Sequence, residues 1–187
     1  MMAKEFGFAL ADEEKTYLRE LVQLSIASRL SPAGAPSGPP EPPTRTLREH
    51  LGAFVTLKLG GSLRGCIGNV RGTGELYRTV WDMARSAAFE DPRFPPLTPG
   101  EFEAMEYEIS ILGPIESCPD PELVEVGRHG LIMSRDGHSG LLLPQVPVEW
   151  RWDRETFLDQ TCVKAGLPRD AWREPATTIL WFEAVVF

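Results

Sequence analysis

The residue types that could carry chemistry come together first in one short segment, Leu63-Arg64-Gly65-Cys66-Ile67-Gly68. The thiol of Cys66 would act as a nucleophile or redox group if a neighbouring cation lowered its pKa, and Arg64 stands two residues earlier. Arg64 would also bind an anionic ligand, or form an ion pair with a carboxylate of the protein itself. The candidates for that carboxylate are Asp91, Glu106 and Glu108. The other interpretation of Cys66 is a buried and inert strand residue, which is the commoner role of a strand cysteine.

Two glycines in this segment, Gly65 and Gly68, extend the predicted ligand site. Glycine weakens a strand, so its presence indicates that a ligand or another backbone passes close by. The loop that contains Asp91 and Arg93 is a candidate wall of the same site, and we predict that both residues bind the ligand. Both also have a structural explanation, because aspartate before proline ends a helix and arginine often ties such a loop down.

His129 precedes a predicted strand and is the candidate acid or base near neutral pH, although a lone histidine is more often a hydrogen-bonded loop residue. Cys66 and His129 are therefore the two predicted catalytic residues. A metal site would need distant His129 or His138 to converge on Cys66, so we predict no metal. The sequence shows no phosphate-binding loop, serine triad or paired carboxylates, and we predict no cofactor.

The composition limits the class of protein. A chain of 187 residues with 42% hydrophobic residues fits one globular domain. Its formal net charge of -8 disfavours nucleic acid and anionic membranes as partners, because both are negative. Its three cysteines are widely spaced, which is typical of reduced thiols, and no apolar run is long enough for a signal peptide or a membrane span. We therefore expect a cytoplasmic protein.

The hydrophobic pattern predicts helices and strands in irregular order. A helix over residues 13–30, capped by Asp12, is followed by an exposed proline-rich linker over residues 31–43. A plain connector is the favoured role of this linker, and a ligand for a proline-reading domain is the alternative. The remaining predicted elements are strands over 53–59 and 62–67, a helix over 74–90 capped by Thr73, a capping box from Thr98 to Glu101, a strand over 105–112, strands over 130–135 and 140–143, a helix over 153–165 capped by Asp153 and a strand over 177–187. This order predicts an α+β protein with a mixed, largely antiparallel sheet and flanking helices.

The register of the first hairpin decides which face Arg64 and Cys66 occupy. A two-residue loop at Gly60-Gly61 would place both on the face of the apolar residues of the first strand. A three-residue loop, Leu59-Gly60-Gly61, places Leu63 and Ile67 on that apolar face instead. Arg64 and Cys66 then share the other face with Thr56 and Phe54. The apolar pattern favours this second register.

Several segments together resemble one family, the AMMECR-type domain, which in bacteria and archaea is called AmmeMemoRadiSam system protein A. The segments that carry the resemblance, in chain order, are GAFVTL (52–57), LRGCIG (63–68), DPRFPPL (91–97), EISIL (108–112), VGRHGL (126–131), LLPQV (142–146) and CVKAGL (162–167). The similarity runs from about Glu13 to Phe187, and the proline-rich stretch is the part that it does not match. The chain is thus predicted to be a single AMMECR-type domain over residues 1–187.

The resemblance implies an α+β fold with a larger and a smaller lobe, and a cleft near residues 63–68. It also implies partnership with a radical S-adenosylmethionine enzyme and a Memo-like protein. The first hypothesis is an enzyme or enzyme component that holds a small anionic substrate through Arg64, with Cys66 as nucleophile or redox group. The alternative is a non-catalytic adaptor or substrate-presenting subunit for that system. Nucleic-acid binding is a weaker third hypothesis, and the sequence leaves the oligomeric state open.

Overall fold

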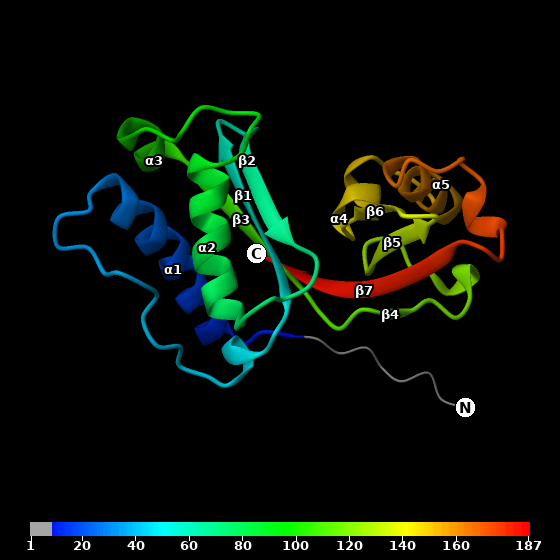
Figure 1. Ribbon diagram of the computed structural model, residues 1–187, viewed down its shortest axis with the longest axis horizontal. Coiled ribbons are helices and arrows are strands. Elements are labelled where there is room, and N and C mark those ends of the chain that lie inside the picture. Colours follow the sequence, from blue (N-terminus) through cyan, green and yellow to red (C-terminus); the bar gives the residue numbers. More distant parts are fainter. Residues whose placement is uncertain (1–8) are drawn as a thin grey trace. The chain divides into compact units, whose positions relative to one another are not determined.

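The computed structural model describes residues 9–187, which divide into two compact units. The larger unit comprises residues 9–112 together with 185–187, and the smaller unit comprises residues 113–184. The boundary falls inside the last strand, so the C-terminal residues return to the unit in which the described chain begins. Figure 1 labels the elements of both units.

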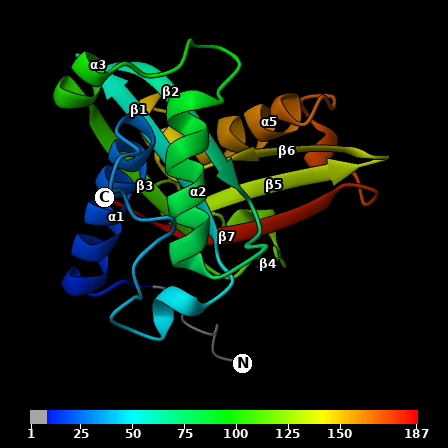
Figure 2. The ribbon, with the colours of Figure 1, turned by 60° about the vertical axis from the view of Figure 1, so that its left-hand side comes forward.

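The larger unit places two helices on one face of an antiparallel sheet. Its strands are β1 (Gly52–Leu59), β2 (Ser62–Asn69) and β3 (Glu106–Leu112), in the order β2-β1-β3. Its helices are α1 (Asp12–Leu30), α2 (Leu76–Phe89) and the short α3 (Pro99–Ala104), with a 3-10 turn, η1, at Thr46–Arg48. Helices α1 and α2 lie side by side, and α2 packs on β1 and β2 (Figures 1 and 2). The core lies between them, with Leu18, Leu21, Val22, Ile26, Val80 and Ala84 against Ala53, Val55 and Leu57.

The strands of the smaller unit pair antiparallel, and this unit has its own core. Strand β5 (His129–Arg135) pairs with β6 (His138–Leu142) and with β7 (Thr178–Val186), and the two-residue strand β4 (Glu116–Ser117) pairs with β7. The helical segments are η2 (Pro121–Leu123), α4 (Gln145–Glu149), α5 (Arg154–Lys164) and η3 (Ala171–Arg173). The core includes Leu131, Met133, Phe157, Leu158, Cys162 and Trp172. The predicted α+β fold with flanking helices is therefore confirmed. The sheet was predicted to be mixed and largely antiparallel, and the strand pairings described here are all antiparallel.

The helix ends show which capping predictions were right. Asp153 accepts the N–H of Thr156 at 2.8 Å, and Thr98 and Glu101 form the predicted capping box of α3. Thr73 is not the cap of α2, which begins later, after Glu75, because the N–H of Leu76 is taken by the carbonyl of Glu49. Asp12 is likewise not a cap but lies in the first turn of α1, after the N-cap residue Ala11. Here a distant carbonyl and a neighbouring glutamate replaced the expected local caps.

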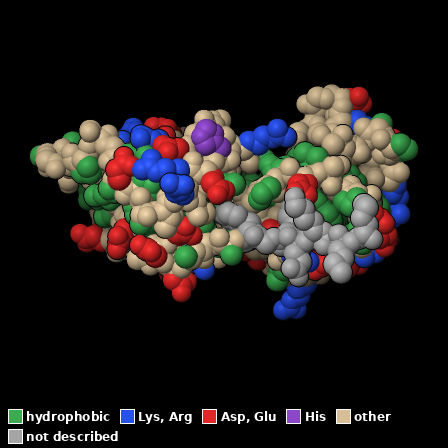
Figure 3. All heavy atoms as spheres, turned by 90° about the horizontal axis from the view of Figure 1, so that it is seen from below, with side chains coloured by type: hydrophobic (Ala, Val, Ile, Leu, Met, Phe, Trp, Pro, Cys, Tyr) green, Lys and Arg blue, Asp and Glu red, His purple; other side chains and the backbone are tan. Residues whose placement is uncertain are grey.

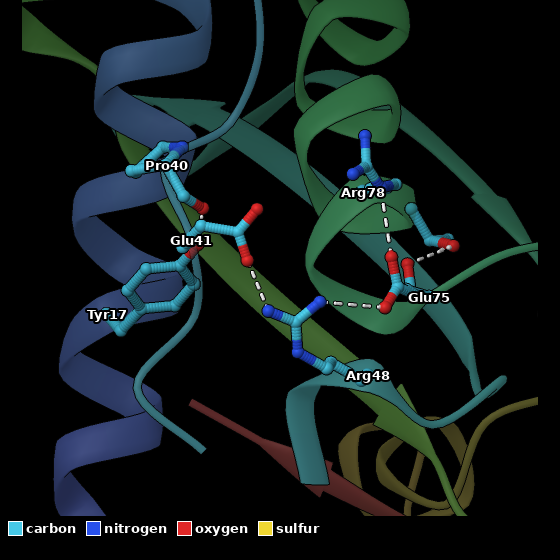
Figure 4. A network of polar contacts seen from close by, with 7 residues as sticks. Tyr17, Pro40, Glu41, Arg48, Glu75 and Arg78 are labelled. Carbon is cyan, nitrogen blue, oxygen red and sulfur yellow. Dashed lines mark hydrogen bonds and ion pairs between the residues drawn. The ribbon is translucent and has the colours of Figure 1, made fainter. Parts of the chain in front are cut away.

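The proline-rich segment is largely exposed and is held at its C-terminal end by a polar network (Figure 4). The hydroxyl of Tyr17 donates to the carbonyl of Pro40 at 2.6 Å, and burial raises the pKa of Tyr17 to about 12, which keeps this donor protonated. Arg48 bonds to Glu41 and, at 3.1 Å, to Glu75. The segment is thus tied to α1 and to the start of α2.

The surface carries charges of both signs. On the face seen in Figure 3, Lys and Arg side chains are interspersed with Asp and Glu side chains and with hydrophobic ones. None of the helices within residues 9–187 has the length and apolar character needed to cross a membrane.

Candidate functional site

The hairpin that carries the predicted site contains a tight turn and a β-bulge. Gly60 and Gly61 both have positive φ, 54° and 77°, which is the signature of a two-residue type I′ turn. Leu59 therefore faces Ser62 across the turn. The register then shifts by one residue, so that Arg64 is the extra, unpaired residue of the bulge.

The bulge corrects the predicted register. Beyond it Cys66 faces Thr56, on the face opposite the apolar core, as predicted. The predicted three-residue loop is wrong, and so is the position of Leu63, which faces Lys58 and is 44% exposed. Arg64 and Cys66 do not act from one shared face, because the arginine leaves the alternation of the strand at the bulge.

Arg64 is held inside the protein by the N-terminal turn of α3. Its Nε and Nη2 donate to the two carboxylate oxygens of Glu101 at 2.9 and 3.1 Å, and Nη2 also donates to the carbonyl of Pro95 at 2.9 Å. The Arg64 side chain is only 9% exposed and lies near the ring of Phe94. The ion pair with Arg64 lowers the pKa of Glu101 to about 2.

The structural partner of Arg64 is therefore not one of the three carboxylates predicted from the sequence. In this bidentate pair Glu101 takes up the Nε and Nη2 donors that an anionic ligand would otherwise bind. One guanidinium nitrogen, Nη1, is buried and has no hydrogen-bond partner within residues 9–187. Ligand binding by Arg64 stays a prediction, and the contact that the structure shows is its ion pair with Glu101.

Asp91 and Arg93 clamp the free edge of β2 at Cys66. The Oδ2 atom of Asp91 accepts the backbone N–H of Cys66 at 2.9 Å, and Nη2 of Arg93 donates to the Cys66 carbonyl at 3.2 Å. The two clamping side chains also bond to each other, at 2.9 and 2.7 Å. Together they satisfy the groups that a further strand would otherwise pair with.

The two side chains of this clamp differ in how far they are exposed to solvent. The Asp91 side chain is fully buried, whereas that of Arg93 is 53% exposed. Hydrogen bonds from Arg93 hold the pKa of Asp91 far below its usual range, although burial alone would raise it. Asp91 is therefore a permanent anion with its acceptors in use, and Arg93 keeps part of its guanidinium accessible.

The thiol of Cys66 belongs to a row of polar side chains across three strands. It is half-buried, and the Thr56 hydroxyl donates to its Sγ at 3.2 Å. Thr56 in turn faces Glu108 on β3, whose Oε2 lies 3.6 Å from Nζ of Lys58. We call Cys66, Thr56, Glu108 and Lys58 the polar row. The sequence analysis missed the row as a unit, because its members are adjacent only once the strand pairing is known.

The two glycines have close neighbours within the protein. A Cβ on Gly65 would lie 2.1 Å from the backbone carbonyl oxygen of Ala87 in α2, so another backbone does come close there. A Cβ on Gly68 would lie 2.3 Å from two atoms of the Phe54 ring. Both glycines are thus explained by internal packing, and their predicted contact with a ligand stays a prediction.

His129 lies in the smaller unit, where it is buried. Its Nδ1 accepts the N–H of Glu125 at 3.0 Å, so the neutral ring carries its proton on Nε2. The ring lies 4.5 Å from that of Trp181, and burial lowers the pKa of His129. These contacts all belong to the smaller unit, and its predicted acid-base role stays a prediction.

The described part of the chain contains no cluster that would form a metal centre. Within residues 9–187, no group of three or more His, Cys, Asp or Glu side chains is arranged to hold a metal ion. A groove of about 630 Å³ lies elsewhere in the larger unit. Its lining residues come from α1, α3 and β3: Thr16, Arg19, Glu20, Gln23, Leu24, Ala27, Phe102 and Tyr107.

Fold and site together define a class: an α+β protein whose arginine–cysteine strand is bulged, clamped at its edge and followed by the DPRFPPL loop. The family model that matches this chain is AMMECR1, over residues 20–187. The chain therefore belongs to the AMMECR1 family, as the sequence motifs predicted. The match covers most of both units, and their behaviour as one domain stays a prediction.

Archaeal relatives agree with this assignment. A protein of Thermococcus gammatolerans is 43% identical over 96% of this chain and 92% of its own length. A protein of Methanothermobacter thermautotrophicus is 47% identical over 75% of this chain and 76% of its own. The crystal structure of the uncharacterized protein PH0010 from Pyrococcus horikoshii superposes with a TM-score of 0.86 at 39% identity, and covers 96% of this chain and 93% of that one.

Proposed function

We propose that this protein binds a small anionic ligand at the polar row around Cys66 and acts together with a radical S-adenosylmethionine enzyme and a Memo-like protein. One observation carries the ligand part. The backbone of Cys66 is fixed on both its N–H and its C=O by Asp91 and Arg93, while its thiol stays half-buried on a polar face. Fixing a partly exposed residue in this way is what binding and catalytic sites require, and an inert strand cysteine needs neither feature.

The cations that serve the ligand are Arg93 and Lys58. Arg64 is sequestered by Glu101, whereas the side chains of Arg93 and Lys58 are 53% and 36% exposed. Arg93 reaches Cys66 from the edge of β2, and Lys58 shares the face of the polar row. In this proposal Arg64 fixes the loop and α3, and the two exposed cations contact the anion.

The test compares two alkylating reagents that differ in charge, iodoacetate and iodoacetamide, at each of the three cysteines. Mass spectrometry of the folded protein gives the rate at every thiol, normalised to glutathione. We expect Cys66 to react faster than Cys118 and Cys162, because burial raises the pKa of both other thiols. We also expect the ratio of iodoacetate to iodoacetamide rates to be at least threefold higher at Cys66 than at Cys118.

Two matched variants separate local charge from general reactivity. Lys58→Met is expected to lower the charge ratio at Cys66, and Glu108→Gln to raise it, since Glu108 is the partner of Lys58. Equal labelling of the three cysteines, or no labelling of Cys66, would remove the thiol from the proposal. If neither variant changes the ratio of iodoacetate to iodoacetamide rates at Cys66, the ligand proposed for this site is not an anion.

The partnership rests on the family resemblance. Its test is co-purification of the tagged protein with the radical S-adenosylmethionine enzyme and the Memo-like protein of the same organism. Wild type is expected to recover both partners. Cys66→Ser and Lys58→Met distinguish the roles: loss of the radical enzyme's activity with unchanged partner recovery supports a ligand site, and unchanged activity would exclude the polar row from the function.

A non-catalytic adaptor is the second candidate, and the groove on α1 and α3 favours it. Leu24 in this groove is 37% exposed, next to the partly exposed rings of Phe102 and Tyr107, which is the composition that partner interfaces use. Leu24→Glu should abolish partner recovery if the protein is an adaptor that docks through this groove. Cys66→Ser should leave partner recovery intact. Loss of recovery in Cys66→Ser with normal recovery in Leu24→Glu would exclude the groove as the docking site.

A further inference from the structure

We infer that the ligand of the polar row is a flat, conjugated or aromatic anion that stacks on Phe54. This inference rests on the proposed function and names the class of ligand that the same site takes. It begins from the packing of Phe54 on Gly68, which face each other across β1 and β2.

Gly68 lets the ring of Phe54 lie along the sheet. Two ring atoms stand 2.3 Å from where a Cβ of Gly68 would be, so any side chain there would push the ring away from the strand. Because glycine weakens an edge strand, its use at this position has a cost that the ring offsets by covering the backbone. The ring of Phe54 therefore forms a flat apolar surface along the sheet, which we call the floor, and does not project away from it.

Phe54 keeps part of its surface exposed, and the residues that follow it on its face are polar. Phe54 is only half-buried, in contrast to Ala53, Val55 and Leu57 on the other face of the same strand. The residues that follow it on its own face are Thr56 and Lys58. A single aromatic ring at the end of a polar row offers a stacking surface to one flat group.

The position of the floor relative to the thiol sets the shape of the ligand. Phe54 faces Gly68 and Thr56 faces Cys66, so Phe54 and Cys66 are diagonal neighbours, about 7–8 Å apart in a regular sheet. Lys58 lies beyond Thr56 on the same face. A ring stacked on Phe54, with its substituent pointing along the polar row, places a carboxylate beside Cys66, on the side from which the ammonium of Lys58 attracts it.

The experiment uses two carboxylates of the same charge and ring size, benzoate and cyclohexanecarboxylate, with acetate as the small reference. Each is titrated as a protecting agent against alkylation of Cys66 by iodoacetamide. Benzoate is expected to protect at concentrations about fivefold lower than cyclohexanecarboxylate, since only the flat ring stacks. In Phe54→Leu this preference should fall to about one, while protection by acetate is unchanged.

Gly68→Ala is expected to reproduce the loss, because its methyl group displaces the ring. That methyl group also lies 2.5 Å from the carbonyl oxygen of Ala53, so thermal unfolding checks that the variant is folded. Gly74→Ala is the control, since a Cβ there meets no atom within 4 Å. Saturation-transfer NMR with the same carboxylates on Cys66→Ala repeats the comparison without the thiol. Protection by all three anions without a preference for benzoate would overturn the flat ligand and leave the proposed function standing. Absence of protection and of NMR transfer by every anion would overturn both.

Discussion

The carboxylate of Asp91 accepts the backbone N–H of Cys66 at 2.9 Å, so a side chain stands where the next strand of the sheet would pair. Arg93 completes this arrangement from the other side of the same residue. The strand that carries Arg64 and Cys66 thus has its edge closed at Cys66. Edge strands need such protection, and here it also fixes the thiol-bearing residue.

Replacement of Asp91 should destabilise the protein strongly. Asp91→Ala leaves the Cys66 N–H without a partner and the Arg93 guanidinium without its counter-ion, which together should cost about 2–4 kcal/mol of unfolding free energy. Urea denaturation measures this cost. Asp170→Ala, at an exposed aspartate of the smaller unit whose side chain makes no capping hydrogen bond, should change it by less than about 1 kcal/mol. Equal effects of the two changes would show that the clamp has no special role.

Protonation of Glu101 should lower the stability of the protein at acidic pH. Its pKa in the folded protein is lowered to about 2 by Arg64, from about 4.3 in the unfolded chain, so the stability that it contributes is present above pH 4.3. This stability is lost as the pH falls toward 2. Glu101→Gln should flatten the fall of the thermal midpoint between pH 5 and pH 2, whereas Glu103→Gln on the same helix should not.

The packing of α2 on the motif makes Gly65 intolerant of any side chain. Gly65→Ala would place a methyl group 2.1 Å from the carbonyl oxygen of Ala87, a backbone atom that moves only with the helix. We expect a loss of about 2–3 kcal/mol in unfolding free energy. Gly74→Ala, with open space around it, should change stability by less than about 1 kcal/mol. A stable Gly65→Ala protein would show that α2 can shift without loss of packing.

The type I′ turn predicts opposite effects at its two glycines. Gly60→Asn should be neutral or slightly stabilising, because asparagine suits the first position of a type I′ turn. Gly61→Val should cost about 1–2 kcal/mol, since a β-branched residue resists positive φ. Thermal unfolding of both variants tests the two-residue turn. Stabilisation by Gly61→Val would argue for a different loop.

His129 should contribute stability that depends on pH near neutrality. Burial lowers its pKa below the 6.5 of an exposed histidine, and Nδ1 accepts a hydrogen bond only when the ring is neutral. The contribution is thus present above pH 6.5 and lost as the pH falls through the lowered pKa. His129→Asn should reduce the loss of stability between pH 7 and pH 5, measured by urea denaturation, and His138→Asn at an exposed position should not.

Local patterns predicted most of the elements because their causes are local. Alternation located β1 and β2, the glycine pair located their turn, and the Thr98–Glu101 box located α3, since each depends on residues a few positions apart. The cap of α2 was misjudged because the carbonyl of Glu49, just after η1 and far earlier in the chain, bonds to its first N–H. The short helix α4 and strand β4 were not predicted, since elements of this length carry little periodicity.

The sequence by itself determined the family, the α+β class and the segment in which the site lies, because motif order and hydrophobic period are properties of the chain alone. Only the tertiary structure decided the partners inside that segment. A one-residue bulge sent Arg64 to Glu101 and left Cys66 beside Thr56, and a loop 25 residues later closed the strand edge. Side chains that meet across strands and loops are set by register and packing, and a shift of one residue redirects them all.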